Sequence, residues 1–167
     1  MGTATETRTP VEIARELFGE VLNRRDADEL APYWAEDVHE VFPTHEVHGR
    51  QGMRDYFAET FAAIPDFHIE AEHVIGQDEV VFVKWHMSGT FSGAPWMGFE
   101  PTGDRIELDG CDCFTIRDRL VVHNHVFYDQ VAFGRQIGLL PADGSGAEKA
   151  MTAAFNARVK LKRRFRG

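Results

Sequence analysis

Cysteine is scarce in this chain of 167 residues, which contains only Cys111 and Cys113. On a strand, two residues in a CxC pair point to the same face, where an unstrained disulfide is difficult to form. A CxC pair without further thiols is also a weak signal for a metal site. We therefore expect neither a disulfide framework nor a thiolate metal centre, and interpret both cysteines as small buried residues.

Long apolar runs are also missing. The first ten residues, MGTATETRTP, lack the basic and apolar regions of a secretion signal, and no apolar run is long enough to span a bilayer. Glu6 stands where the myristoylation pattern requires Ser or Thr. We expect a soluble, cytoplasmic protein with no membrane partner.

Positive charge is scarce outside the C-terminus. The formal net charge is -9, yet residues 147–167 carry seven Lys or Arg against one Glu, a balance of +6 that leaves -15 on the rest. An acidic body repels phosphate backbones, so we expect no nucleic-acid partner.

The hydrophobic pattern changes from helical to strand-like along the chain. Thr9-Pro10-Val11-Glu12 predicts a helix start with a capping box, and helical spacing continues to about residue 23. Further helices are predicted from residue 26 and up to Pro65, and a short strand at 38–42. Four runs with period-two alternation follow, at residues 67–76, 79–91, 104–116 and 120–128. Helices followed by a strand meander predict an α+β domain with one antiparallel sheet.

The last part of the chain changes character again. A short helix is predicted over residues 131–138, and ADGSG at 142–146 has the composition of a linker. The segment after it predicts a basic amphipathic helix or tail. We therefore divide the chain into one domain at 1–141 and an extension at 142–167, which we expect to dock on an acidic surface or to remain disordered.

Five short motifs carry a family resemblance. They are IPD at 64–66, QDEVVFVKWHMSGTFSG at 77–93, PTG at 101–103, GCDCF at 110–114, and Asp129 followed by RQIGLLP at 135–141. In this order and spacing, over roughly residues 11–141, the sequence resembles the SnoaL-like polyketide cyclases of the NTF2-like superfamily.

The resemblance implies a cone, in which a strongly curved antiparallel sheet wraps against the N-terminal helices and encloses an apolar pocket. It also implies a homodimer formed through the sheet, and intramolecular aldol cyclisation of a hydrophobic polyketide by an acid/base Asp, without metal or cofactor. Epoxide hydrolysis, isomerisation and dehydration occur on the same fold, as do non-catalytic modules that bind ligands or proteins. An open cavity with converging polar groups would favour an enzyme, and a filled cone a scaffold.

Asp129 matches the family's acid/base position. A carboxylate at the rim of an apolar pocket is a suitable base, because desolvation raises its pKa. The alternative is that Asp129 caps the following helix, where backbone N–H groups would lower the pKa instead. The catalytic interpretation predicts that Asp129→Asn abolishes turnover.

Three more polar residues are candidates for the site. His125 stands where relatives usually carry Trp, and could act as the acid/base partner of Asp129 or be a hydrogen-bonded strand histidine. Asp112 is either a second catalytic carboxylate in the pocket or a paired interface residue. His86 lies in the pocket or on the convex face, depending on which side of its strand faces inward.

The predicted substrate-binding surface is aromatic, with His86 as its polar member. Its aromatic members are Tyr33, Trp34, Phe57, Phe61, Trp96 and Phe99. Trp96 and Phe99 lie in the unusually apolar loop 92–103, which either closes over the mouth of the cone or packs against a partner subunit. The pairs His45/His48 and His123/His125 could supply four metal ligands, but both spacings are common without metal. We predict no metal and no cofactor.

Overall fold

The structure is a computed structural model that describes residues 8–165. Its helical elements are α1 (Pro10–Glu16), the π-helical η1 (Leu17–Val21), the 3₁₀ turns η2 (Leu22–Arg24) and η3 (Ala31–Tyr33), α2 (Ala27–Leu30), α3 (Gly49–Ala63), α4 (Gln130–Gln136) and α5 (Gly146–Arg164). Its strands are β1 (Trp34–Val41), β2 (Glu46–His48), β3 (His68–Gln77), β4 (Val80–Thr90), β5 (Arg105–Arg117) and β6 (Leu120–Tyr128).

The first helix begins as its sequence predicts. The Thr9 side chain accepts a hydrogen bond from the Glu12 backbone N–H, and the Glu12 carboxylate accepts one from the Thr9 N–H, which completes the capping box. The helix then widens into η1, tightens into η2, and ends at Arg25, whose φ is 56°. The predicted extent to about residue 23 is therefore confirmed, although the helical geometry is not uniform.

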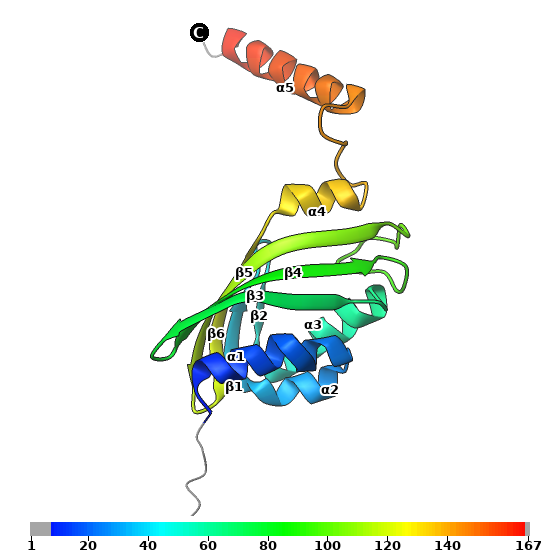
Figure 1. Cartoon of the computed structure of the whole chain (residues 1–167). Helices are drawn as coiled ribbons and strands as arrows, with labels where there is room; N and C mark the ends of the chain where they lie inside the picture. The colour runs from blue at the N-terminus through cyan, green and yellow to red at the C-terminus, as the bar shows by residue number, and fades with distance from the viewer. Residues whose placement is uncertain (1–7, 166–167) are drawn as a thin grey trace, which may run out of the picture.

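All six strands form one curved sheet in the order β2-β1-β6-β5-β4-β3 (Figure 1). The four strands from β3 to β6 are an antiparallel meander, as predicted. β1 differs, because it pairs with β6 in parallel. A parallel pair needs a long connection, and here β2, α3 and the strands β3–β5 lie between β1 and β6 in sequence.

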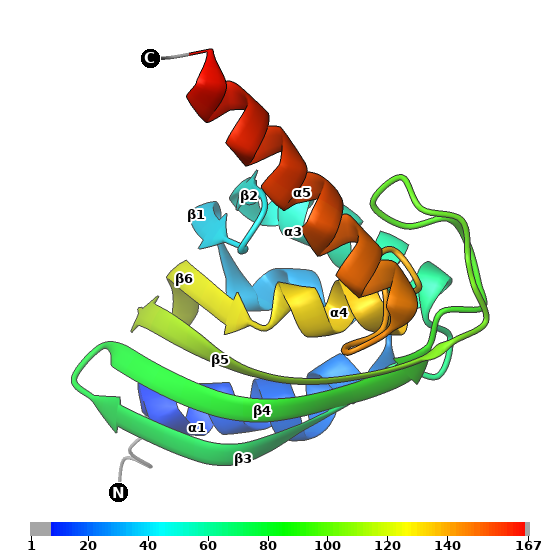
Figure 2. The same cartoon turned by 90° about the horizontal axis from the view of Figure 1, so that it is seen from above.

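The two faces of the sheet have different surroundings. Figures 1 and 2 show the sheet bent around the N-terminal helices, with α1 packed on β3 and α3 packed on β1. Inward residues of the meander are apolar and buried, such as Val81, Val83 and Trp85 on β4, whereas Phe82, between Val81 and Val83, is exposed. This alternation is the half-buried strand pattern seen in the sequence. It fixes which side chains can reach the interior.

The C-terminal helix stands away from this body. α5 projects beyond α4 (Figure 1), and none of its described residues is buried. Its first turn is held by Glu148, which forms an ion pair with Arg135 of α4. The predicted basic helix is therefore formed. No described helix is long and apolar enough to cross a membrane.

Candidate active site

An apolar cavity lies between the concave face of the sheet and the helices. Its volume is about 90 Å³. Its lining comes from η1, η2, β1, α3, the meander and α4, and consists of Leu17, Phe18, Leu22, Trp34, Glu40, Phe42, Tyr56, Phe57, Thr60, Phe67, Ile69, Trp85, Met87, Trp96, Leu108, Asp112, Phe114, Val126, Tyr128 and Phe133. Only two of these residues are acidic, and both belong to one hydrogen-bonded network.

Glu40 of β1 and Asp112 of β5 are joined through Asn124 of β6. The Asn124 Nδ2 group donates to Glu40 Oε1 at 2.6 Å and to Asp112 Oδ2 at 2.9 Å. Glu40 is 3% exposed, Asp112 7% and Asn124 0%. Burying two carboxylates costs free energy unless they are paired or neutralised, so a network of this kind is more typical of function than of stability.

Each carboxylate also accepts a hydrogen bond from a tryptophan. Trp85 Nε1 donates to Asp112 Oδ1 at 2.8 Å, and Trp34 Nε1 donates to Glu40 Oε2 at 3.3 Å. The indole of Trp85 lies directly over Gly110, where an added Cβ would be 2.2 Å from the ring. The glycine in GCDCF thus leaves room for the ring that orients Asp112 two residues later.

The two carboxyl groups titrate differently. Burial, followed by the negative charge of Asp112, raises the pKa of Glu40 to about 8. Burial raises the pKa of Asp112 to about 6, opposed by the hydrogen bonds from Trp85 and Asn124. At neutral pH the cavity therefore holds one protonated carboxylic acid and one carboxylate. This combination supplies an acid and a base in one site.

Two tyrosines add hydroxyl groups to the cavity lining. Burial raises the pKa of Tyr56 and of Tyr128, and for Tyr56 the neighbouring acidic groups of Tyr128 and Glu40 act in the same direction. Both phenols therefore stay protonated at neutral pH and can donate hydrogen bonds. The cavity combines apolar walls with a few polar groups, as small-molecule sites do.

Among the predicted aromatic residues, three line this cavity: Trp34, Phe57 and Trp96. Phe61 is buried against the rings of Phe57 and Phe67 and is not part of the lining. Phe99 pairs with Trp96 through two backbone hydrogen bonds of 2.9 Å and lies outside the lining. Tyr33 also lies outside it, and its hydroxyl donates to Glu16 Oε1 at 2.9 Å. Three of the six predicted aromatic residues, Phe61, Phe99 and Tyr33, therefore do not line the cavity.

The apolar loop 92–103 brings Trp96 inward through a tight turn. Met97 and Gly98 have φ values of 51° and 82°, as expected for the two central residues of a type I′ turn. Trp96 packs edge-on against Phe91 and Phe133. We call residues 96–99 the Trp96 turn, and its Trp96 side chain forms part of the cavity wall.

His86 and His125 lie on the outer face of the sheet. His86 Nδ1 is 3.0 Å from Asp109 Oδ1, another outward residue. The ring of His125 packs against that of Phe127 at a tilt of 31°, with centroids 4.1 Å apart, and neither residue lines the cavity. The register explains this, because Asn124 and Val126 point inward and the histidine between them must point outward.

Asp129 is the N-cap of α4. Its side chain accepts hydrogen bonds from the backbone N–H groups of Val131 at 2.8 Å and Ala132 at 3.0 Å. It is exposed and does not line the cavity. Of the two interpretations of this residue, the geometry supports the helix cap.

The cap makes a testable prediction. Asp129→Asn retains a side chain that caps well, so stability and turnover should stay close to those of the unchanged protein. Asp129→Ala should lower the free energy of unfolding by about 1 kcal/mol, because two backbone N–H groups lose their acceptor. Thermal unfolding and kcat/KM of both variants check this. Loss of turnover in a folded Asp129→Asn protein would restore the catalytic assignment.

Two functional candidates, Glu40 and Asn124, were missed in the sequence. Glu40 alternates with Val38 and Phe42, so the strand pattern of VHEVF already placed a carboxylate on an apolar face. Asn124 alternates with Val126 in the same way. The histidines on either side of Asn124 carry the side chain most often used as a general acid or base, so the sequence pattern favoured them over the inward-facing amide.

Comparisons with known proteins agree with this architecture. The sequence profile described as SnoaL-like polyketide cyclase matches residues 12–137. This chain belongs to the SnoaL-like polyketide cyclase family. A search among curated proteins finds no match.

Solved structures of SnoaL-like and other proteins share the fold of this SnoaL-like chain. AclR from Streptomyces galilaeus is 19% identical, with a TM-score of 0.69 over 92% of this chain and 96% of its own. TsrD from Streptomyces laurentii is 20% identical, with a TM-score of 0.69 over 81% and 100%. A SnoaL-like polyketide cyclase from Agrobacterium tumefaciens is 23% identical, with a TM-score of 0.63 over 79% and 100%. Such identities show a common fold and leave the reaction to be argued from the site.

Proposed function

We propose that this protein is a cofactor-independent acid/base enzyme that acts on a hydrophobic, polyketide-like carbonyl compound by aldol-type cyclisation. The observation that carries the proposal is the pair of buried carboxyl groups, Asp112 and Glu40, in one apolar cavity with pKa values on opposite sides of neutrality. Family membership supports the substrate class.

Asp112 is the proposed base. Its carboxylate removes a proton from the carbon next to a substrate carbonyl, and the C–H electron pair moves into the enolate. The hydrogen bonds from Trp85 and Asn124 hold the carboxylate in place, and its oxygens have further lone pairs free to accept the proton.

Glu40 is the proposed acid. Its neutral carboxyl group, with the hydroxyl groups of Tyr56 and Tyr128, donates hydrogen bonds to oxygen atoms that become negative. The enolate carbon attacks a second carbonyl of the same substrate and forms the ring C–C bond. The alkoxide takes a proton from Glu40, and transfer of the proton held by Asp112 back to Glu40 restores the site.

Substrate entry requires the cavity to widen. The present volume of about 90 Å³ is below the roughly 300–1,000 Å³ of pockets that hold drug-sized ligands. The Trp96 turn is the natural element to move, because it is a short turn held to the body through the ring of Trp96. Its closure over substrate would exclude water from the enolate.

Epoxide hydrolysis is the second candidate. The same acid and base could protonate an epoxide oxygen and activate a water molecule, and the presence of two bridged carboxyl groups rather than one favours this reaction as the alternative. The non-catalytic alternative is a module that only holds an apolar ligand. Incubation with poly-β-ketone and epoxide panels, followed by mass spectrometry, separates the three. Cyclisation keeps the composition of the substrate or releases water, hydrolysis adds water, and a binding module returns its ligand unchanged.

The pH dependence of the reaction follows from the two pKa values. Asp112 must be ionised, so kcat/KM should rise as pH increases through about 6. Glu40 must be protonated, so kcat/KM should fall as pH increases through about 8. We expect a bell-shaped profile with apparent limits near these values, measured with buffers of constant ionic strength. A profile that is flat from pH 5 to pH 9 would contradict the acid/base assignment.

A further inference from the structure

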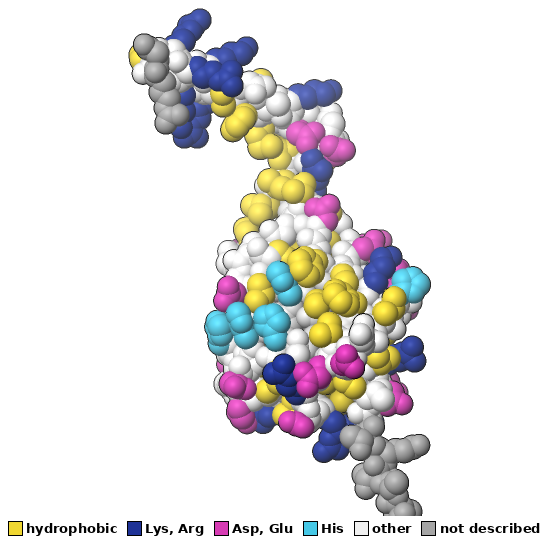
Figure 3. Space-filling model, turned by 90° about the vertical axis from the view of Figure 1, so that its left-hand side faces the viewer, with side chains coloured by type: hydrophobic (Ala, Val, Ile, Leu, Met, Phe, Trp, Pro, Cys, Tyr) yellow, Lys and Arg dark blue, Asp and Glu magenta, His cyan; other side chains and the backbone are white. Residues whose placement is uncertain are grey.

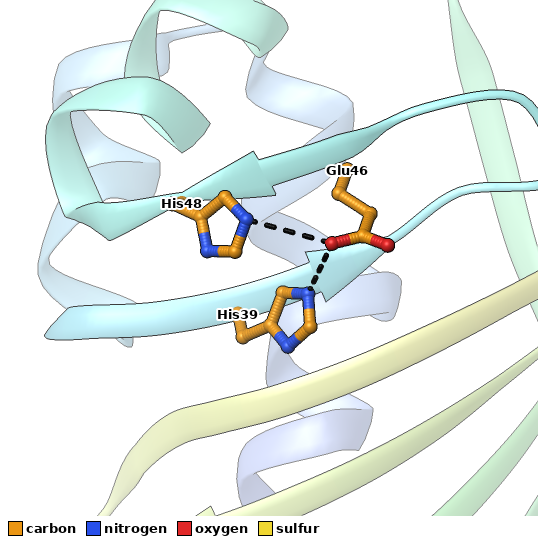
Figure 4. A group of neighbouring side chains, drawn as sticks. All are labelled: His39, Glu46 and His48. Atoms are coloured by element: carbon orange, nitrogen blue, oxygen red, sulfur yellow. Dashed lines mark hydrogen bonds and ion pairs between the residues drawn. The ribbon is translucent and has the colours of Figure 1, made fainter.

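Two histidines and a glutamate meet on the outer face of the β1–β2 hairpin (Figure 4). His39 of β1 lies directly opposite His48 of β2, and Glu46 is two residues before His48, so all three side chains share one face. Glu46 Oε2 is 2.9 Å from His39 Nε2 and 3.5 Å from His48 Nε2. The arrangement was not visible in the sequence, where His39 is seven residues from Glu46.

We propose that His39, Glu46 and His48 form a binding site for a divalent transition-metal ion of the zinc class. Imidazole nitrogens and carboxylate oxygens are its ordinary ligands. Metal–ligand bonds of about 2.0–2.1 Å in a tetrahedral site place the ligand atoms about 3.3 Å from one another. The two distances to the Glu46 oxygen are close to this value, and all three ligand atoms lie within 4.8 Å of one another.

The surroundings offer a fourth ligand. His123 of β6 is opposite His39 in the sheet, and the centroids of the two rings are 5.2 Å apart. The His39 and His48 rings are stacked, with centroids 4.5 Å apart. Figure 3 shows histidine side chains gathered on this face of the molecule. A zinc ion would complete its coordination with His123 or with water.

The fold combines histidines differently from the two pairs considered in the sequence. The ring of His45 stacks on Phe42, with centroids 4.8 Å apart, and contacts Tyr56, so it is separated from His48. The ring of His125 packs against that of Phe127. The strand register instead aligns one histidine from each of three neighbouring strands: His48 of β2, His39 of β1 and His123 of β6.

The proposed metal site is independent of the proposed acid/base site. Glu40 points into the cavity, whereas its neighbour His39 points out on the opposite face of β1. A bound ion would join the three-residue edge strand β2 to β1, and so stabilise the folded state by mass action. The result of the metal-binding test is therefore independent of the activity tests of the proposed acid/base site.

The test is metal binding to the full chain, produced without a histidine tag and freed of metal with a chelator. Competition with a chromogenic chelator measures Zn²⁺ affinity, and visible absorption of bound Co²⁺ reports tetrahedral coordination. We expect one ion per chain. His48→Gln and Glu46→Gln should each weaken Zn²⁺ binding at least tenfold, because each removes one of the three proposed metal ligands.

The matched control is His68→Gln. His68 also pairs with a glutamate, Glu70, at 3.1 Å, but the pair contains a single imidazole. The control should bind Zn²⁺ with unchanged affinity, and metal-free thermal unfolding should be similar for all variants. Two results would overturn the proposal: no uptake of Zn²⁺ at one equivalent, or equal affinity in the unchanged protein, His48→Gln and Glu46→Gln.

Discussion

Replacing Asp112 with asparagine is expected to lower kcat about 10²- to 10⁴-fold, the usual contribution of a general base. The change conserves shape, and the new Asn oxygen can still accept from Trp85 Nε1, which lies 2.8 Å from the present carboxylate. What is lost is the negative charge that takes the proton. The amide NH2 group takes the place of the oxygen that accepts from Asn124 Nδ2, so that hydrogen bond is lost, and we expect the free energy of unfolding to fall by about 1 kcal/mol. The measurement is single-turnover kinetics on the substrate found in the panel.

The matched control for this experiment is Asp109→Asn. Asp109 is on the same strand but points outward, where it pairs with His86. Its replacement should leave turnover unchanged. A folded Asp112→Asn protein with full activity would exclude Asp112 as the base.

Trp85→Phe distinguishes a positioning role from a merely structural one. The phenyl ring keeps an aromatic side chain on β4, but it lacks both the N–H that donates to Asp112 and the outer part of the indole that lies over Gly110. Because that hydrogen bond lowers the pKa of Asp112, its loss should move the acidic limb of the pH profile to higher pH. A purely structural tryptophan would change kcat without moving the limb.

Glu40→Gln is expected to remove a large pH dependence from stability. Below pH 4.5 the carboxyl group is protonated in both the folded and the unfolded chain, so it has no effect. Between pH 4.5 and about 8 the unfolded chain releases the proton while the folded protein keeps it, and the free energy of unfolding falls. Above about 8 the cost is constant, and its upper bound is about 5 kcal/mol.

Chemical denaturation at a series of pH values measures this effect. The unchanged protein should lose stability as pH rises from 5 to 8, and Glu40→Gln should lose much less, while its turnover is reduced through loss of the acid. Asp37→Asn is the control, because Asp37 is an exposed carboxylate on the same strand. Parallel pH curves for the unchanged protein and Glu40→Gln would show that Glu40 is not the group that retains the proton.

Much of the fold could be predicted because the signals are local. The capping box at Thr9, the four alternating runs and the breaker Pro65 each act within a few residues, and the strands β3–β6 begin and end within two residues of the predicted runs. The parallel pairing of β1 with β6 could not be predicted in this way. It joins Trp34 with Val121, and nothing near either residue specifies the partner.

The site was predicted less well for the same reason. Asp112 was recognised as a pocket candidate, but its bridge to Glu40 through Asn124 joins three strands and is visible only when they are side by side. His86 and His125 have the chemistry of catalytic residues, and the register turns both of them outward. Alternation along one strand divides its side chains between two faces, but it does not show which face lines the cavity.

The sequence by itself determined the secondary structure, the family and the apolar character of the interior, because periodicity, caps and motifs act over short distances along the chain. Only the tertiary structure decided which carboxylates are buried together, that Asp129 caps α4, and that His39, Glu46 and His48 converge. A pKa shift or a ligand cluster depends on distances between residues that are far apart in sequence, and those distances exist only once the sheet has closed around its helices.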